Sequence, residues 1–591
     1  MMKLKFYILI TLSLVLFLSH NLTGQEAITA KDLYKHIDFL ASDSLKGRKP
    51  GTEESKIAAQ YIADEFKHYG LKLLAKDGFQ YFDVKSGVKP GDNYLKINGA
   101  DVEPGKEYTV LSYSENVKSK SDILFLGYGF DINDDKLKWN DYQDVDVTDK
   151  WVVIFRGHPE LDQRMSMFSN YADERAKILT AKDKGAIGVI FVSPAKMDEQ
   201  DELIPLKMGR GDVKAGLPVI QVKRTIAEKI VNKSISALEN TLNDGRKPIS
   251  FDCKSEIEIK TEVNYQVLKT QNVIGVIEGN DPVLKNEYIL VGAHYDHLGI
   301  GGPGSGSRQP DTLAIHNGAD DNASGVATIL EIAQKLAAQS KKIKRSILFI
   351  AFGAEESGLL GSQYFANHPL VDLNKIDAML NFDMVGRLNS TTNEVSVGGT
   401  GTAAEWETML TDYQKNSPLK LAFSKEGYGP SDHASFYSQN IPVLFFNTGV
   451  HNDYHTPADD TEFINFDGQE KLTKMGADLV LQLSTQMEGL HFQESGPKKQ
   501  TSSREGMKVR LGIMPGFAST DNNGLKVEGV TKDGPAEKAG LLKGDLIISI
   551  NGEKIQNIYD YMNRLKKFNP GDRISVDVLR SEEKKVFIVD L

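Results

Sequence analysis

The chain has little cysteine, few long apolar runs and no excess of basic residues. Cys253 is the only cysteine among 591 residues, so an internal disulfide is excluded. With no partner and no histidine cluster nearby, this thiol is expected to be a buried small residue rather than a nucleophile. The formal net charge of −11 argues against a nucleic-acid partner. The sequence also has no internal repeat and no long low-complexity tract.

The N-terminus carries the one long apolar run. Two lysines precede the segment from Phe6 to Leu18, and small and polar residues follow it. This order is typical of a secretory signal peptide, and the run is shorter than the ~20 apolar residues of a membrane span. We therefore expect residues 1–24 to be a signal peptide and the mature protein to be periplasmic or secreted, with no membrane span. Retention of the segment as an anchor remains an alternative, and a lipoprotein is disfavoured because no cysteine follows the run.

The remaining chain contains several segments with different sequence patterns. Residues 31–70 have a helical pattern, with Ala58, Ile62 and Phe66 on one face and an end at Gly70. Short β-rich runs then indicate a small inserted α/β unit, and after it apolar strands alternate with amphipathic helices. That alternation predicts an α/β domain with a mixed, mostly parallel sheet sandwiched by helices. The predicted limits are 25–104 and 263–492 for this domain, 105–262 for the insert, 493–508 for a linker and 509–591 for a β-rich module.

Acidic and histidine residues gather where the predicted strands end. In open α/β sheets, ligands collect at the carboxyl ends of the strands. A histidine or a carboxylate pair at one strand end is common on protein surfaces, but five such groups in succession are not explained by solvation. The groups are His294, Asp296 and His297 in "HYDH", Asp320 and Asp321 in "GADDNASG", Glu355 and Glu356 in "AEES", Asp383 in "FDMVG", and His455 in "YHTPADD".

These segments contain almost no basic residue that could neutralise the carboxylates, and Arg387 is the nearest. Buried carboxylates without partners are costly, so divalent cations are the natural compensation. Mixed histidine and carboxylate donors suit zinc, and cobalt or manganese accept the same donors. Because the donors outnumber the three protein ligands of one catalytic zinc, two metals that share a bridging carboxylate fit better.

The motifs "HYDHLG", "NGADDNASG", "AEESGLLGS", "FDMVG", "SDHASF" and "YHTPADD" occur in the order found in a known family. With them the chain resembles the zinc-dependent aminopeptidases, the co-catalytic di-zinc exopeptidases, over roughly residues 30–100 and 265–490. The resemblance implies the zinc exopeptidase fold, two Zn²⁺ ions and hydrolysis of the N-terminal peptide bond of peptide substrates. The ligands it implies are His294 and Asp383 for one zinc, Glu356 and His455 for the other, and Asp321 as the bridge.

The resemblance also implies roles for residues around these ligands. Glu355 would be the general base, Asp296 would orient His294, and Tyr454 would donate a hydrogen bond to the developing oxyanion. The Asp321–Asn322 peptide bond is expected to be cis, as it commonly is in the family. Relatives on the same fold leave alternatives open: a one-zinc glutaminyl cyclase, a dipeptidase or carboxypeptidase, or a peptide-binding protein that has lost its metals.

Two further motifs are expected to be structural rather than catalytic. Ser431, Asp432 and His433 are contiguous, and a contiguous tripeptide cannot adopt the geometry of a serine-protease triad. We expect Asp432 to support the site from nearby. The glycine-rich stretch 299–311 lacks the Gly–Lys–Ser/Thr of a phosphate-binding loop, and we expect it to form a flexible loop at the rim of the site.

The accessory segments resemble two further families. The insert at 105–262 is similar to a protease-associated domain, which implies either a substrate-selecting lid or a passive spacer. In the C-terminal module, "RLGIM" and "VEGVTKDGPAEKAGLLKGDLIISINGEKI" resemble a bacterial-type PDZ domain. Such domains bind an extended peptide or a protein C-terminus as an added strand.

Overall fold

The computed structural model describes residues 27–591 apart from 135, 164–165, 208–212, 497–508, 516–522 and 532–533. By contacts the chain divides into two units, 1–84 with 268–500 and 85–267 with 501–591. The predicted signal peptide and most of the predicted linker lie outside the described residues, and the domain limits derived from the sequence stay predictions. A search of the described helices finds none with the length and apolarity of a membrane span.

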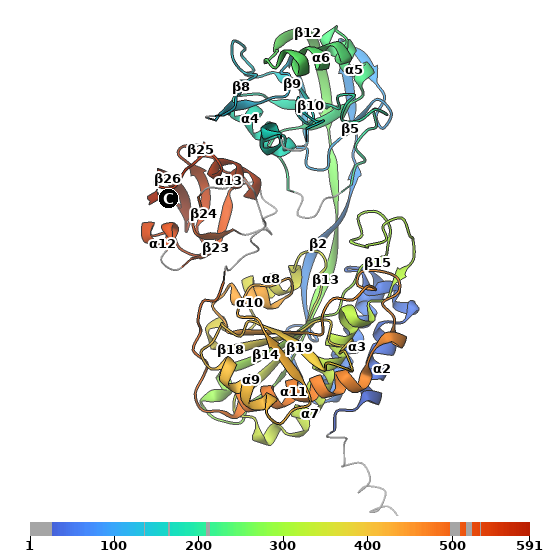
Figure 1. Cartoon of the computed structure of the whole chain (residues 1–591), viewed down its shortest axis with the longest axis vertical. Coiled ribbons are helices and arrows are strands. Elements are labelled where there is room, and N and C mark those ends of the chain that lie inside the picture. The colour runs from blue at the N-terminus through green and yellow to red at the C-terminus, as the bar shows by residue number, and fades with distance from the viewer. Residues whose placement is uncertain are drawn as a thin grey trace, which may run out of the picture. The chain divides into compact units, whose positions relative to one another are not determined.

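The first unit is built on a mixed sheet that has nine strands within the described residues, in the order β1-β13-β17-β14-β18-β21-β19-β20, with β2 paired to β13 (Figure 1). Its strands are β1 Lys72–Leu73, β2 Phe79–Pro90, β13 Val263–Ile277, β14 Tyr288–His294, β17 Ser346–Phe352, β18 Ile376–Phe382, β19 Glu394–Gly398, β20 Lys420–Phe423 and β21 Val443–Asn447. Its helices are α2 Ala30–Leu40, α3 Glu53–His68, α7 Gly325–Ala338, α8 Leu360–Asn367, α9 Trp406–Gln414, α10 His433–Tyr437 and α11 Phe466–Thr485.

Helices cover both faces of this sheet, which explains why its central strands are apolar without alternation. Every residue of β17 is buried. Phe349 packs into the larger core, which also contains residues of α2, α3, α7 and α11, whereas the next residue, Ile350, packs with Phe365 and Phe436 of α8 and α10. Figure 1 shows these two sets of helices on opposite sides of the sheet. The predicted α/β class with a mixed sheet between helices is confirmed.

Four neighbouring strands, β17, β14, β18 and β21, run parallel. The chain passes from β14 through α7 to β17 on one side of β14, and then crosses to β18 on the other side. The carboxyl ends of the four strands therefore meet at one edge, where the strand order reverses. A crevice outside the strand ends at such a switch point is the usual ligand site of an open α/β sheet.

Residues 31–70, where the sequence indicates a helical pattern, do not form a single helix. The segment forms α2 and α3 with a 3₁₀ segment, η1 Asp43–Arg48, between them. Lys46, Gly47 and Arg48 all have positive φ, and a Cβ on Gly47 would lie 2.3 Å from the carbonyl oxygen of His316. The close approach requires glycine, and the left-handed residues break the helix.

The second unit contains the insert and the C-terminal module, each with its own apolar core. Between residues 85 and 267, the described strands of this unit are β3 Tyr94–Ile97, β4 Ala100–Val102, β5 Tyr108–Val110, β6 Val117–Phe125, β7 Asp131–Asn133, β8 Lys138–Asn140, β9 Trp151–Phe155, β10 Gly188–Val192, β11 Val219–Val222 and β12 Phe251–Thr261, of which β3 and β4 precede the predicted start of the insert. The helices in this range are α4 Glu174–Asp183, α5 Arg224–Val231 and α6 Ile235–Gly245. The C-terminal module has β22 Ile513–Pro515, β23 Leu525–Val530, β24 Leu546–Ile550, β25 Glu553–Lys554, β26 Arg573–Arg580 and β27 Glu583–Asp590, with α12 Pro535–Ala539 and α13 Ile558–Leu565. Cys253 is buried in the insert core, and burial raises its pKa to about 12, as expected for an unreactive thiol.

Candidate metal centre

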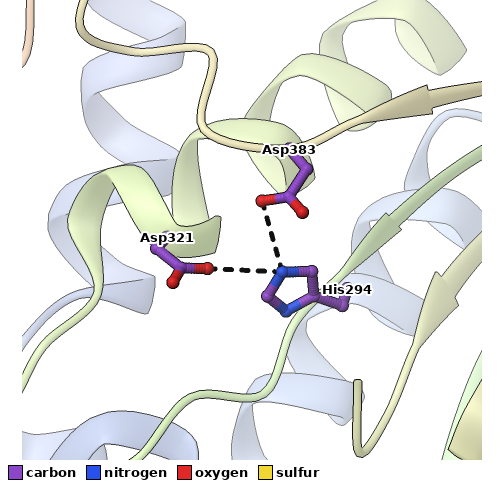
Figure 2. Close-up of side chains that lie close together, drawn as sticks. All are labelled: His294, Asp321 and Asp383. Atoms are coloured by element: carbon purple, nitrogen blue, oxygen red, sulfur yellow. Dashed lines mark ion pairs between the residues drawn. The ribbon is translucent and has the colours of Figure 1, made fainter. Parts of the chain in front are cut away.

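Three side chains from different elements form the first half of the site. His294 is the last residue of β14, Asp383 directly follows β18, and Asp321 lies before the start of α7. The Nε2 atom of His294 is 3.3 Å from Oδ1 of Asp321 and 3.4 Å from Oδ1 of Asp383 (Figure 2). All three side chains are buried or nearly so, and their donor atoms lie close enough together to hold one metal ion.

The second half of the site lies on the other oxygen of Asp321. Nε2 of His455 is 3.1 Å from Oδ2 of Asp321 and 3.2 Å from Oε1 of Glu356. Glu356 follows β17 in the chain, and His455 lies in the loop after β21. Asp321 therefore presents one oxygen to His294 and the other to His455, which is the arrangement expected of a bridging carboxylate.

The backbone around Asp321 positions it tightly. The Asp321–Asn322 peptide bond is cis, as expected. The Asn322 side chain donates to the carbonyl of Phe382 and accepts from the amide of Gly325. A Cβ on Gly325 would lie 2.3 Å from that carbonyl oxygen, so only glycine lets α7 begin against the end of β18. The small residues of "GADDNASG" thus let the loop approach the strand ends closely.

Asp320, for which the sequence indicated no role, is held by groups outside the metal cluster. It accepts a hydrogen bond from the amide of Gly386 at 2.6 Å, and its other oxygen is 3.3 Å from Nε2 of His451. Asp459 accepts from the amides of both Asp320 and Asp321. These contacts fix the loop that carries Asp321. Sequence reasoning did not identify His451 or Asp459, because their contacts depend on loop positions that spacing does not reveal.

Asp296 contacts His294 through its backbone rather than through its side chain. The Nδ1 of His294 donates to the Asp296 carbonyl oxygen at 3.2 Å, whereas the carboxylate lies 3.9 Å away. That carboxylate accepts from the amides of Glu355 and Glu356, at 2.9 and 3.3 Å. Asp296 therefore joins the end of β14 to the Glu–Glu pair, and the backbone carbonyl is the group positioned to fix the tautomer of His294.

Three more residues, Glu355, Tyr454 and His297, lie close to the proposed ligands. Glu355 lies near the cluster, with Oε2 4.0 Å from Nε2 of His294, and Tyr454 stacks on the ring of His455 with centroids 3.9 Å apart. His297, quoted in the "HYDH" motif without a role, lies 2.9 Å from Glu356 through Nδ1. Its position in the motif was the only sequence signal.

The tripeptide at 431–433 has no triad geometry, as expected. Ser431 accepts a hydrogen bond from the side chain of Asn381, and His433 stacks on Phe445 with centroids 4.4 Å apart. Asp432 is fully buried near the site, and burial raises its pKa to about 7 although His294 opposes the shift. The glycine-rich stretch lies at the site: the carbonyl of Gly306 contacts Nδ1 of His455 at 3.2 Å.

The electrostatics of the cluster favour a cation. Burial alone would lower the pKa of His294, but the carboxylates of Asp383, Glu355 and Asp321 raise it well above its usual value. The same balance, with Asp321 and Glu356 as the carboxylates, raises the pKa of His455 to about 10. Histidines that attract a proton this strongly sit in a strongly negative environment, and the nitrogen and oxygen donors together suit a divalent ion of the zinc type.

Comparisons with known proteins find two family matches and several named aminopeptidases. Residues 272–480 match the model of peptidase family M28, and residues 500–591 match that of the PDZ domain. The chain is 28% identical over 467 residues to aminopeptidase YwaD of Bacillus subtilis, covering 76% of this chain and 83% of that protein. It is 27% identical over 310 residues to leucine aminopeptidase 1 of Uncinocarpus reesii, and this match covers 49% of this chain and 74% of that protein.

Among solved structures, an aminopeptidase from Aneurinibacillus sp. strain AM-1 aligns with a TM-score of 0.44 at 23% identity, covering 79% of this chain and 96% of that one. The family match and the named relatives define the class of this protein as a metallopeptidase. More particularly, it carries a peptidase family M28 domain together with a C-terminal PDZ domain, so the family resemblance of its motifs is confirmed.

Proposed function

We propose that this protein is an exported aminopeptidase that uses two zinc ions held by one bridging aspartate. The observation that carries the proposal is the position of Asp321, whose two carboxylate oxygens face His294 and His455 separately. His294 and Asp383 would complete one metal position, and Glu356 and His455 the other. The buried, acidic donor set fits such ions, and relatives named aminopeptidases and leucine aminopeptidases support the substrate class.

Two bound zinc ions would supply a water of lowered pKa and polarise the scissile carbonyl. Glu355 would accept the proton of that water and transfer it to the leaving amine. Burial raises the pKa of Glu355 well above its usual value, with His294 opposing and the neighbouring carboxylates reinforcing the shift, which suits a group that must hold a proton between the two steps. The amide of Glu355 is anchored on Asp296, which keeps the carboxylate beside the ligands.

Tyr454 would assist the same reaction. Its ring stacks on His455, and burial together with the nearby carboxylates of Asp321 and Glu356 raises its pKa well above its usual value. The phenol therefore stays protonated at neutral pH and can donate a hydrogen bond to the developing oxyanion.

The accessory domains are also part of the proposal. The PDZ domain would bind an extended peptide or a protein C-terminus, and the insert would be a protease-associated domain.

A release assay with an amino-acyl chromogenic substrate tests the function. We expect the free amino-acyl compound to be hydrolysed, its N-acetylated analogue to be inert, and a chelator to abolish the activity. Equal cleavage of the blocked analogue would remove the aminopeptidase assignment in favour of another peptidase specificity. Cyclisation of an N-terminal glutamine without amino-acyl release would identify the protein as a glutaminyl cyclase. Peptide binding that a chelator does not affect, without any turnover, would identify it as a metal-free peptide-binding protein.

A further inference from the structure

His297 is a second histidine at the half of the site that contains Glu356. It lies three residues after His294 and is fully buried. Its Nδ1 atom is 2.9 Å from Oε1 of Glu356 and 3.8 Å from Oδ2 of Asp321. These are the same two oxygens that Nε2 of His455 approaches. Two imidazoles and two carboxylates thus converge on one small volume.

The contact between His297 and Glu356 is short but is not a hydrogen bond. Within the described part of the chain, neither ring nitrogen of His297 has a hydrogen-bond partner. Leaving a buried imidazole without a hydrogen bond is costly, and a nitrogen and an oxygen 2.9 Å apart would normally align to avoid that cost. Ligands of a shared cation have this arrangement, because their donor atoms lie close together but point at the ion rather than at one another.

The geometry of the two imidazoles agrees with this interpretation. The rings of His297 and His455 are 5.7 Å apart at an angle of 70°, so they do not stack on each other. They approach the oxygens of Asp321 and Glu356 from different elements, because His297 follows β14 and His455 follows β21. His297, Asp321 and Glu356 place their donor atoms within 4.8 Å of one another, as metal ligands do.

We propose that His297 is a fourth protein ligand of the metal position held by Asp321, Glu356 and His455. This inference rests on the proposed two-metal function and makes the two positions unequal. The position at His294, Asp321 and Asp383 would have three protein donors, the number that leaves a catalytic zinc a place for water or substrate. The position with His297 has four, which is the number found in closed, structural zinc sites. The closed position should therefore hold its metal more tightly and contribute less to binding the substrate.

Equilibrium dialysis of the full chain against buffers of graded free zinc tests the proposal. We expect wild-type protein to bind two ions with unequal affinities. In His297→Gln the tighter ion should be held at least about tenfold more weakly, with the weaker ion little changed. The matched control is His433→Gln, which replaces another buried histidine outside the metal cluster and should retain both affinities. Circular dichroism must show that each variant is folded.

A measurement on the wild-type chain keeps the test independent of folding effects. X-ray absorption at the zinc edge, on protein carrying one zinc per chain, should show two imidazole ligands on the retained ion. A single imidazole, or wild-type zinc affinities in folded His297→Gln, would overturn the inference and leave the two-metal aminopeptidase intact. A wild-type chain that binds no zinc would overturn both, so the two failures are distinguishable.

Discussion

Glu355 and Glu356 are adjacent in the chain, and yet their surroundings shift their pKa values in opposite directions. Burial raises the pKa of Glu355 well above its usual value, and Glu356 and Asp432 reinforce the shift. For Glu356, burial and Asp321 act in the same upward direction, but contacts with His297 and His455 overcome them and lower its pKa to about 2. Two carboxylates whose pKa values are driven apart are suited to different roles, one as a proton carrier and the other as a ligand.

Replacement of Glu355 by glutamine separates these roles. Glu355→Gln keeps the shape of the side chain but cannot accept a proton, so kcat should fall by about 10²–10⁴-fold while both metals stay bound. Glu356→Gln is the matched control at the neighbouring position and should lose metal as well as activity. The measurements are kcat on an amino-acyl chromogenic substrate and metal content by mass spectrometry. Loss of metal from Glu355→Gln would mean that the base and ligand roles are misassigned.

His433 predicts a pH dependence of stability outside the metal cluster. Burial lowers its pKa to about 3 from 6.5, so the folded protein disfavours the charged form. A group with a depressed folded pKa contributes stability above its unfolded pKa and loses it as the pH falls toward the folded pKa. Acidification from pH 7.5 to pH 5 should therefore cost about 2 kcal/mol through this residue.

His433→Gln cannot titrate, so its stability should depend less steeply on pH over this window than that of the wild type. Urea unfolding followed by circular dichroism at the two pH values provides the comparison. If the free energy of unfolding changed with pH equally in the two proteins, protonation of the His433 imidazole would not destabilise the folded state.

The connection between α2 and α3 illustrates how one element supports the site. Arg48, at the end of η1, is fully buried and donates to the carbonyl oxygens of Tyr295 at 2.7 Å and Gly318 at 3.0 Å, and also to those of Leu40 and Asn317. One guanidinium thus joins the loop after β14 to the loop before Asp321. Burial lowers the pKa of Arg48 to about 10, while Asp296, Asp321 and other acidic residues of the site favour its charge.

Arg48→Lys tests this support. A lysine keeps the charge but cannot reach four carbonyls, and each buried carbonyl left unpaired costs about 1–3 kcal/mol. We expect a clear drop in the free energy of unfolding together with weaker metal binding, because both ligand loops lose an anchor. Lys46→Ala, in the same 3₁₀ segment, removes only an exposed ion pair with Glu54 and should remain close to the wild type. Unchanged stability and metal affinity in Arg48→Lys would contradict the supporting role.

The convergence of the strand ends and of the side chains proposed as ligands was predictable from the sequence, whereas the residues that support them were not. His294, Glu356 and Asp383 follow apolar strands, and parallel strands bring their carboxyl ends to one edge, so spacing alone indicates convergence. Arg48 escaped notice because its left-handed conformation, rare outside glycine, interrupts a pattern that looked helical. The long strands β2 and β13 were also missed, since parts of both are polar and exposed and carry no apolar period.

At the scale of the whole molecule, the site belongs to one unit. Every proposed ligand and Glu355 lie between residues 294 and 455, within the unit formed by 1–84 and 268–500, which has its own cores. The PDZ domain has a separate core. A separate core is the property that lets a domain fold alone, so the PDZ domain should be dispensable for the chemistry.

A chain that ends at residue 496 tests this independence. It keeps Gly496, whose carbonyl accepts a hydrogen bond from Tyr437, and it removes the PDZ domain. We expect its kcat/KM for a short amino-acyl substrate to equal that of the full chain, whereas binding of a long peptide through the PDZ domain should be lost. A large fall in kcat/KM with the peptidase unit still folded would show that the PDZ domain contributes to the chemistry.

The central claim is that Asp321 bridges two metal ions between His294 and His455. The number of divalent ions in gently purified, folded wild-type protein, measured by inductively coupled plasma mass spectrometry, tests it most directly. The account predicts two ions per chain, with zinc the main element. A single ion would contradict the bridge and favour the one-zinc alternative, and a content near zero would contradict the metal centre itself.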